Sequence, residues 1–114
     1  MLLTKGNRTI SAVLERLIAQ DYRGLLQLAP RSRLTPEEIK SAVSNYPYRL
    51  IFPTAPLENL MDVVKVAEIN PKCWSVNLSL WTKEEGRSDL TLEMHLIESA
   101  DDLYTIEIDD LHVL

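Results

Sequence analysis

The fold is decided by the stretch Cys73-Trp-Ser-Val-Asn-Leu-Ser-Leu-Trp81, along which apolar and polar residues alternate without a break. In an extended chain, successive side chains point to opposite sides. Trp74, Val76, Leu78 and Leu80 would therefore share one face, and the residues between them the other. This alternation is typical of a strand with one face in a core.

The same alternation returns on both sides of this stretch. Leu90–Glu98 repeats it with four apolar residues on one face, and Leu103–Ile108 continues it with Tyr104, Ile106 and Ile108 inward. Leu60–Ile69 predicts an earlier strand, and Arg49–Phe52 a short edge strand before two prolines. Because short loops separate these segments, the sequence favours an antiparallel meander.

The first 46 residues carry helix signals. From Thr9 to Gln20 the apolar residues follow the spacing of an amphipathic helix. Asp21 is placed to cap a short second helix, which Pro30 stops. A third helix begins at Thr35-Pro36-Glu37-Glu38, which combines a threonine cap, a proline in the first turn and a capping-box glutamate.

Helices first and strands later predict an α+β fold, with the N-terminal helices packed on one face of a C-terminal antiparallel sheet of three to five strands. The 114 residues fit a single domain, 1–114, and 46% hydrophobic with 25% charged residues is ordinary globular composition. No apolar run reaches the roughly 18 residues of a membrane helix, and the polar start does not resemble a secretory signal. We therefore expect a cytoplasmic protein without membrane association.

The charges are divided unevenly along the chain. Residues 1–49 carry eight Lys/Arg against four Asp/Glu, a net charge of +4, whereas residues 50–114 carry four against thirteen, a net charge of −9. Nucleic-acid binding depends mainly on neutralising phosphates, so the acidic half argues against a nucleic-acid ligand. It would attract a basic protein.

Three polar groups in the strand region are candidates for chemistry. Glu93 and His95 lie two apart, so they share a strand face, and such a pair could act as a general base. Asp109, Asp110 and His112 could hold a metal, although their spacing matches no defined ligand motif and an exposed strand end explains them better. With no nucleophile, phosphate loop or HExxH motif present, we predict no catalytic residues, no metal and no cofactor.

Cys73 and the residues between the two clearest strands have simple structural explanations. Cys73 is the only cysteine, so it cannot form an internal disulfide, and we expect it to be buried. Thr82–Asp89 reads as a hairpin connector in which Gly86 supplies a positive φ. Its charges are then those of an exposed tip.

Two groups of motifs resemble known proteins. The Gln20-Asp21-Tyr22 break, the Leu34-Thr-Pro-Glu-Glu38 helix start and the closing Tyr104-Thr-Ile-Glu-Ile-Asp-Asp-Leu-His-Val-Leu114 resemble cystatin-like proteins of the nuclear transport factor two-like type in layout, over most of the chain. The stretch Leu80-Trp-Thr with Ser88-Asp-Leu-Thr-Leu-Glu93 is similar to small bacterial proteins, some of them regarded as immunity proteins of contact-dependent growth inhibition. The resemblance implies a fold more firmly than a chemistry.

These observations lead to the expectation of a non-enzymatic immunity protein that binds and neutralises a basic toxin domain, such as a nuclease, through an acidic surface. Opposite potentials would speed its association. Trp81 is the expected apolar anchor, although packing under the helices explains it equally well. The residues expected to contact the partner are Trp81, Glu84, Glu85, Asp89, Glu93, Asp101 and Asp102.

Two alternatives remain open at this point. One is a small pocket enzyme or ligand-binding protein of the nuclear transport factor two-like type, which would use His95 with Glu93 or Asp109 inside a cavity. The other is a homodimer whose sheets pack face to face.

Overall fold

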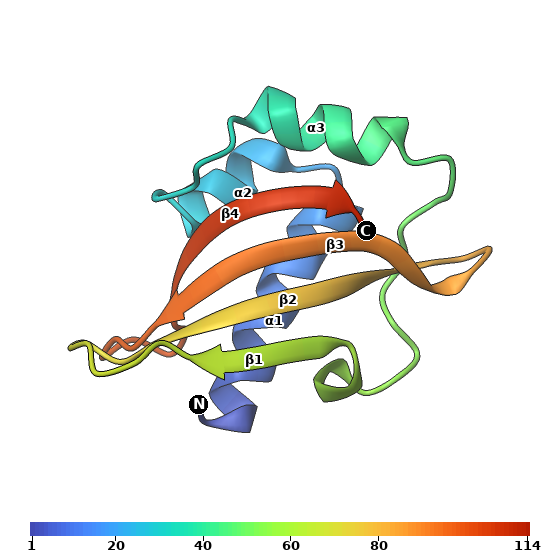
Figure 1. The fold of residues 1–114 in the computed structure, drawn as a ribbon. Coiled ribbons are helices and arrows are strands. Elements are labelled where there is room, and N and C mark those ends of the chain that lie inside the picture. Colours follow the sequence, from blue (N-terminus) through green and yellow to red (C-terminus); the bar gives the residue numbers. More distant parts are fainter.

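The structure, a computed structural model, describes residues 1–114 and confirms the α+β class. Three helices precede an antiparallel sheet with strand order β1-β2-β3-β4, the predicted meander (Figure 1). The elements are α1 (Leu3–Ile18), α2 (Tyr22–Leu28), α3 (Pro36–Asn45), the 3-10 helix η1 (Leu57–Asn59), β1 (Met61–Lys65), β2 (Cys73–Thr82), β3 (Gly86–Ile97) and β4 (Thr105–Val113). None of the helices combines the length and the apolar composition needed to span a membrane.

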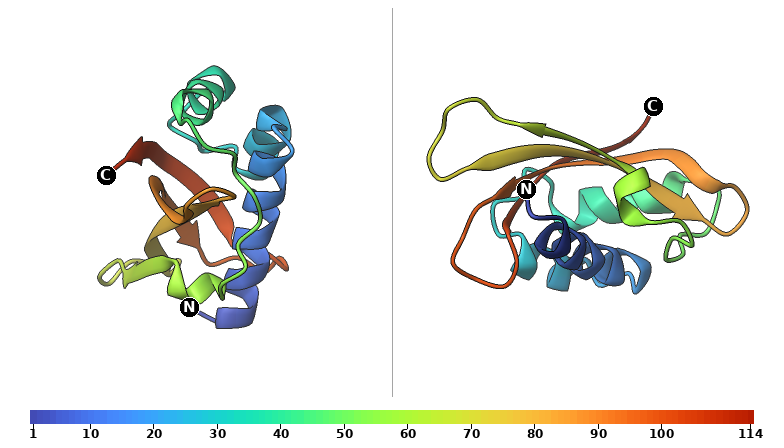
Figure 2. Two further views of the ribbon diagram at one scale, coloured as in Figure 1. Left: turned by 90° about the vertical axis from the view of Figure 1, so that its right-hand side faces the viewer. Right: turned by 90° about the horizontal axis from the view of Figure 1, so that it is seen from below.

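The helices lie on one side of the sheet and leave its other side bare (Figure 2). Helix α1 runs behind the strands, and α2 and α3 lie near β4 (Figure 1). Between the layers, 22 buried residues form one core. It includes the apolar positions predicted for β2 and β3, all of which are at most 8% exposed. Burial of these side chains is the main force that holds the layers together.

Helices α2 and α3 begin for the reasons visible in the sequence. Asp21 accepts a hydrogen bond from the Gly24 N–H and so caps α2. Thr35 and Glu38 form the predicted capping box, which starts α3. Helix α1 starts six residues earlier than predicted. Its first turn is held by the β3–β4 loop, because the Leu2 N–H donates to Tyr104 Oη and Lys5 Nζ donates to the Ser99 carbonyl.

Several strand boundaries differ from the prediction. Arg49–Phe52 is not a strand, because only Leu50 makes a bridge, to Thr82, and prolines on both sides prevent a longer ladder. Strand β1 ends at Lys65, short of the predicted Ile69. The Thr82–Asp89 connector is shorter than expected, since β3 begins at Gly86, whose φ of +74° confirms its role in the turn.

The largest difference lies in β4, which continues to Val113 through the acidic pair that appeared to end it. The ladder pairs Met94 with Ile108 and Glu93 with Asp110, so Asp109 is an extra residue in a bulge. The bulge resets the alternation. Ile108 and Leu111 are therefore both buried, although three positions separate them.

Candidate functional site

The bulge in β4 turns two consecutive carboxylates toward the bare face of the sheet, which we call the open face. In a regular strand, Asp109 and Asp110 would point to opposite sides. Here Asp109 contacts His95, and Asp110 contacts His112. Bulges often re-aim side chains at functional sites. The structure therefore separates the Asp109, Asp110 and His112 group of the sequence into two neighbouring clusters.

The first cluster is centred on His95. Its Nδ1 lies 2.5 Å from Asp109 Oδ2, and the Asp109 side chain is only 17% exposed. An ionised carboxylate can only accept, so Nδ1 carries the proton of this hydrogen bond and Nε2 is left as the basic atom. Arg33 Nε lies 3.6 Å from Asp109 Oδ1 and 3.7 Å from Glu107 Oε1.

Arg33 reaches the sheet because the loop between α2 and α3 is tied to β4. The Arg33 N–H donates to the Ile108 carbonyl over 2.8 Å. Its guanidinium, 71% exposed, then lies beside two carboxylates of the acidic half. An arginine of the basic half thus offsets part of the negative charge at this end of the open face, while solvent weakens the interaction.

The second cluster is centred on His112. Its Nδ1 lies 3.1 Å from both Glu93 Oε2 and Asp110 Oδ2, without the geometry of a hydrogen bond to either. All three side chains are between one-third and about one-half exposed. They border a hollow of about 170 Å³ on the open face, together with Asp62 and Arg87.

Each cluster has a donor set that a metal ion could use. In both, one imidazole nitrogen and two carboxylate oxygens lie within 4.8 Å of one another. One set is Glu93, Asp110 and His112; the other is His95, Glu107 and Asp109. Imidazole with carboxylates suits Zn²⁺ and similar divalent ions. The same distances also suit histidine–carboxylate pairing without a metal.

The residues expected to contact a partner occupy three separate places. Glu93 lies in the middle of the open face, whereas Asp101 and Asp102 lie in the β3–β4 loop beside Lys5 and Arg8. The hairpin end of the sheet holds the other four, Trp81, Glu84, Glu85 and Asp89.

Two of the three hairpin carboxylates are engaged within the fold, and the third, Asp89, is exposed. Glu84 accepts from the Arg49 N–H, and Glu85 accepts from Tyr46 Oη over 2.6 Å. Trp81 is partly buried against the core, with its indole ring 3.4 Å from the place of a Cβ on Gly86. The expected residues thus do not form one continuous patch.

Sequence reasoning missed a row of polar residues that crosses the whole sheet. Asp62, Asn77, Glu93 and Asp110 are successive cross-strand partners on β1, β2, β3 and β4. The row places Glu93 beside Asp110 on the open face, with Asn77 between Glu93 and Asp62. The alternation of each strand indicated its outward residues, but the row depends on the strand registers, which no single strand reveals.

The residues of the enzyme alternative do not meet in one cavity. Glu93 lies with His112, while His95 lies with Asp109 and borders a separate hollow of about 350 Å³. That hollow also contacts Cys73, which is buried as predicted. Burial raises the pKa of the Cys73 thiol, and the nearby carboxylates of Glu107 and Asp109 raise it further. The thiol is therefore a poor nucleophile.

Comparison with known proteins gives one family. Residues 14–114 match the model of a family described as Domain of unknown function (DUF7668), and the chain belongs to it. No curated protein matches the chain, and neither does any solved structure.

Proposed function

We propose that this member of the DUF7668 family is a non-enzymatic binding protein of the immunity type. It neutralises a basic toxin domain, such as a nuclease, by covering it with the acidic open face of its sheet. The cytoplasm, where such a toxin would act, is its proposed compartment. The proposal keeps the acidic contact expected from the sequence but centres it on Glu93 and its neighbours across the strands.

The main support for this proposal is the row formed by Asp62, Asn77, Glu93 and Asp110, which we call the acidic row. Glu93 and Asp110 are directly opposite each other, and Asp62 lies two strands away from Glu93 in the same row. Like charges in directly opposed positions destabilise a sheet. Their presence on a face that no helix covers suits recognition of a cation better than stability of the fold.

The geometry also fits a protein-sized partner. The open face is formed by all four strands, and its carboxylates stand on paired strands, two of them at the β4 bulge, instead of on loops. A partner can meet them with little loss of conformational freedom, which favours tight association. Lysines and arginines on the partner would pair with the row, and the shallow hollow beside His112 can receive one side chain.

The test is a capture experiment with two charge-matched variants. Glu93→Gln/Asp110→Asn neutralises the centre of the row, whereas Glu15→Gln/Glu37→Gln removes the same charge from exposed positions on the helices. Tagged proteins are used to capture partners from the native host at low and at high salt. A basic protein should bind the unchanged chain and the helix variant, and the row variant should associate roughly three- to tenfold more slowly at low salt.

The captured protein must also behave as a toxin. Its expression should arrest bacterial growth, and co-expression of the unchanged chain should restore growth better than co-expression of the row variant. Equal protection by the row and helix variants, or a complex that ignores ionic strength, would contradict the mechanism.

A second candidate function is favoured by His95 alone. The Asp109 contact orients its imidazole, and the ring borders the 350 Å³ hollow, an arrangement that suits proton abstraction from a small molecule held there. The probe is 5-nitrobenzisoxazole, whose ring opens when a base removes one proton. If His95 acts as the base, the unchanged chain should open the ring faster than free imidazole does. His95→Gln should lose this rate enhancement, and His112→Gln should keep it.

A further inference from the structure

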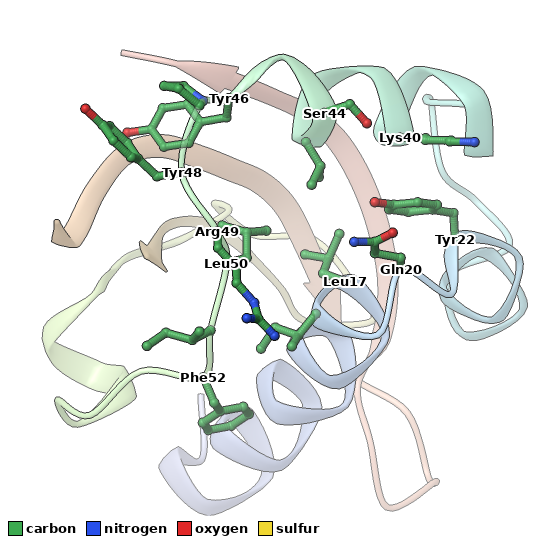
Figure 3. A pocket seen from close by; sticks show the side chains of 14 residues that line it. Leu17, Gln20, Tyr22, Lys40, Ser44, Tyr46, Tyr48, Arg49, Leu50 and Phe52 are labelled. Carbon is green, nitrogen blue, oxygen red and sulfur yellow. The ribbon is translucent and has the colours of Figure 1, made fainter. Parts of the chain in front are cut away.

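A cavity of about 500 Å³, larger than the hollows on the open face, lies among the helices. It is an open cavity bordered by the end of α1, the start of α2, α3 and the extended segment 46–52 (Figure 3). Nine of its fourteen lining residues are hydrophobic. Polar and apolar atoms share the exposed lining about equally, so a cavity of this size can hold a small molecule with both a polar and an apolar part.

Aromatic side chains form much of the cavity wall. Tyr22 comes from α2, and Tyr46, Tyr48 and Phe52 come from the opposite segment (Figure 3). The rings of Tyr46 and Tyr48 meet edge to face, with centroids 5.9 Å apart. Tyr48 and Phe52 are each 43% exposed, so part of their apolar surface remains accessible to a ligand. Such walls favour a flat aromatic body.

The side chains that line the cavity carry positive charge, while Glu84 and Glu85 lie just outside it, on the Arg49 N–H and the Tyr46 hydroxyl. Lys40 and Arg49 line it, and no aspartate or glutamate does, although the chain has 17 acidic residues and a net charge of −5. Neither Lys40 Nζ nor the Arg49 guanidinium forms an ion pair within the molecule, whereas Arg33 does. Two unpaired cations beside an apolar wall are complementary to an anionic head on an apolar body.

Gln20 supplies an independent observation. It has a φ of +58° at the end of α1, where its N–H donates to the Leu17 carbonyl and the Asp21 N–H donates to the Arg16 carbonyl. This helix ending strongly favours glycine, because a Cβ is strained there. The chain instead has a glutamine whose amide lines the cavity. Strain of this kind is typical of functional positions.

We infer that this cavity binds a small aromatic carboxylate or a related aromatic anion. The aromatic body lies against the tyrosine rings, and the charged head pairs with Arg49 in the field of Lys40. The Gln20 amide and the Tyr22 hydroxyl are polar donors at the same site. Burial raises the pKa of Tyr22, so its hydroxyl stays protonated, and able to donate, to a higher pH than an exposed tyrosine. This binding is separate from partner recognition on the open face.

The experiment compares two fluorescent probes that share one aromatic framework. 8-Anilinonaphthalene-1-sulfonate is anionic, and N-phenyl-1-naphthylamine is its neutral counterpart. The anionic probe should bind the folded chain one to one, at least about tenfold more tightly than the neutral probe. It should be displaced by 1-naphthoate and not by 1-naphthylmethanol. Equal binding of the two probes, or equal displacement by acid and alcohol, would overturn the inference.

Charge variants locate the site. Lys40→Gln/Arg49→Gln should lower the affinity for the anionic probe at least about tenfold and leave the affinity for the neutral probe unchanged. The matched control, Lys65→Gln/Lys72→Gln, removes the same charge from exposed positions on β1 and in the β1–β2 loop and should change the binding of neither probe. If both double variants lower the affinity for the anionic probe equally, the effect comes from net charge and the proposed site is wrong.

Gln20→Gly separates binding from folding. Glycine relieves the strained φ, so this variant should unfold at a higher urea concentration while it binds the anionic probe several-fold more weakly. Higher stability with unchanged probe affinity would remove Gln20 from the site. None of these variants alters the acidic row, so their failure leaves the proposed function untouched.

Discussion

The Tyr46 hydroxyl donates a hydrogen bond to Glu85 Oε1 over 2.6 Å and so joins the end of α3 to the β2–β3 hairpin. The Glu85 N–H in turn donates to Thr82 Oγ1 within the turn. One carboxylate of the acidic half is thus used to attach the helical layer to the sheet. Sequence alone presented it as a charge available to a partner.

Tyr46→Phe and Glu85→Gln should each destabilise the fold modestly, because each weakens the same hydrogen bond. We expect a loss of about 0.5–1 kcal/mol in the free energy of unfolding, measured with urea, since the bond is exposed. The double variant should cost less than the two single costs combined. Strict additivity would show that the bond is not formed in solution.

The same bond predicts a response to alkaline pH. The hydrogen bond to Glu85 raises the pKa of Tyr46 first of all, and burial and the Glu85 charge add to this. Its stabilising contribution is therefore complete below the unfolded value of about 10 and is lost as the pH rises through the folded value. Absorbance titration of the tyrosines should show one phenol ionising at lower pH in Glu85→Gln. A titration identical to that of the unchanged protein would contradict this assignment.

The β4 bulge predicts an unusual tolerance to deletion. Removal of Asp109 leaves Ile108, Asp110 and Leu111 in regular alternation, so both apolar side chains stay in the core. Removal of Glu107 instead mis-phases the strand between Ile106 and Ile108. We expect circular dichroism to show a folded protein for the first deletion. For the second, urea unfolding should show a loss of several kcal/mol. An equal loss of stability in the two deletion variants would argue that Asp109 is not an extra residue in a bulge.

Cys73 should react slowly with thiol reagents. It is 5% exposed and its pKa is raised chiefly by burial, so little thiolate exists at pH 8 and little of it is accessible. With Ellman's reagent we expect a rate at least roughly tenfold lower than in urea-unfolded protein, rising as the pH approaches 10. A folded rate equal to the unfolded rate would place the thiol at the surface.

Local patterns predicted most of the fold because each acts over a few residues. The alternation in Cys73–Trp81 set the buried face of β2, and the Thr35–Glu38 signals set the start of α3. The order of helices before strands, with short connections between the strands, predicted the antiparallel meander. Arg49–Phe52 was predicted as a strand, but its contact with the end of β2 is limited to the Leu50–Thr82 bridge and two backbone hydrogen bonds, because prolines on both sides prevent a longer ladder.

The candidate surfaces were less accessible to sequence reasoning. Asp109-Asp110 reads as a strand end, and nothing local indicates that one extra residue will be accommodated in the middle of a ladder. Likewise, the cavity between α1, α3 and segment 46–52 joins residues up to 35 positions apart. Neither the acidic row nor this cavity exists in any single segment.

By itself the sequence determined which faces of β2, β3 and the first half of β4 are buried, where α2 and α3 begin, and that negative charge gathers in the strand half. Those properties follow from periodicity, capping and composition, which are local. Only the tertiary structure decided that Asp62, Glu93 and Asp110 align across the strands, that Glu85 serves α3, and that Lys40 and Arg49 border one cavity. Strand register and helix docking minimise the free energy of the whole core, so they are set by contacts between segments and cannot be read from one segment alone.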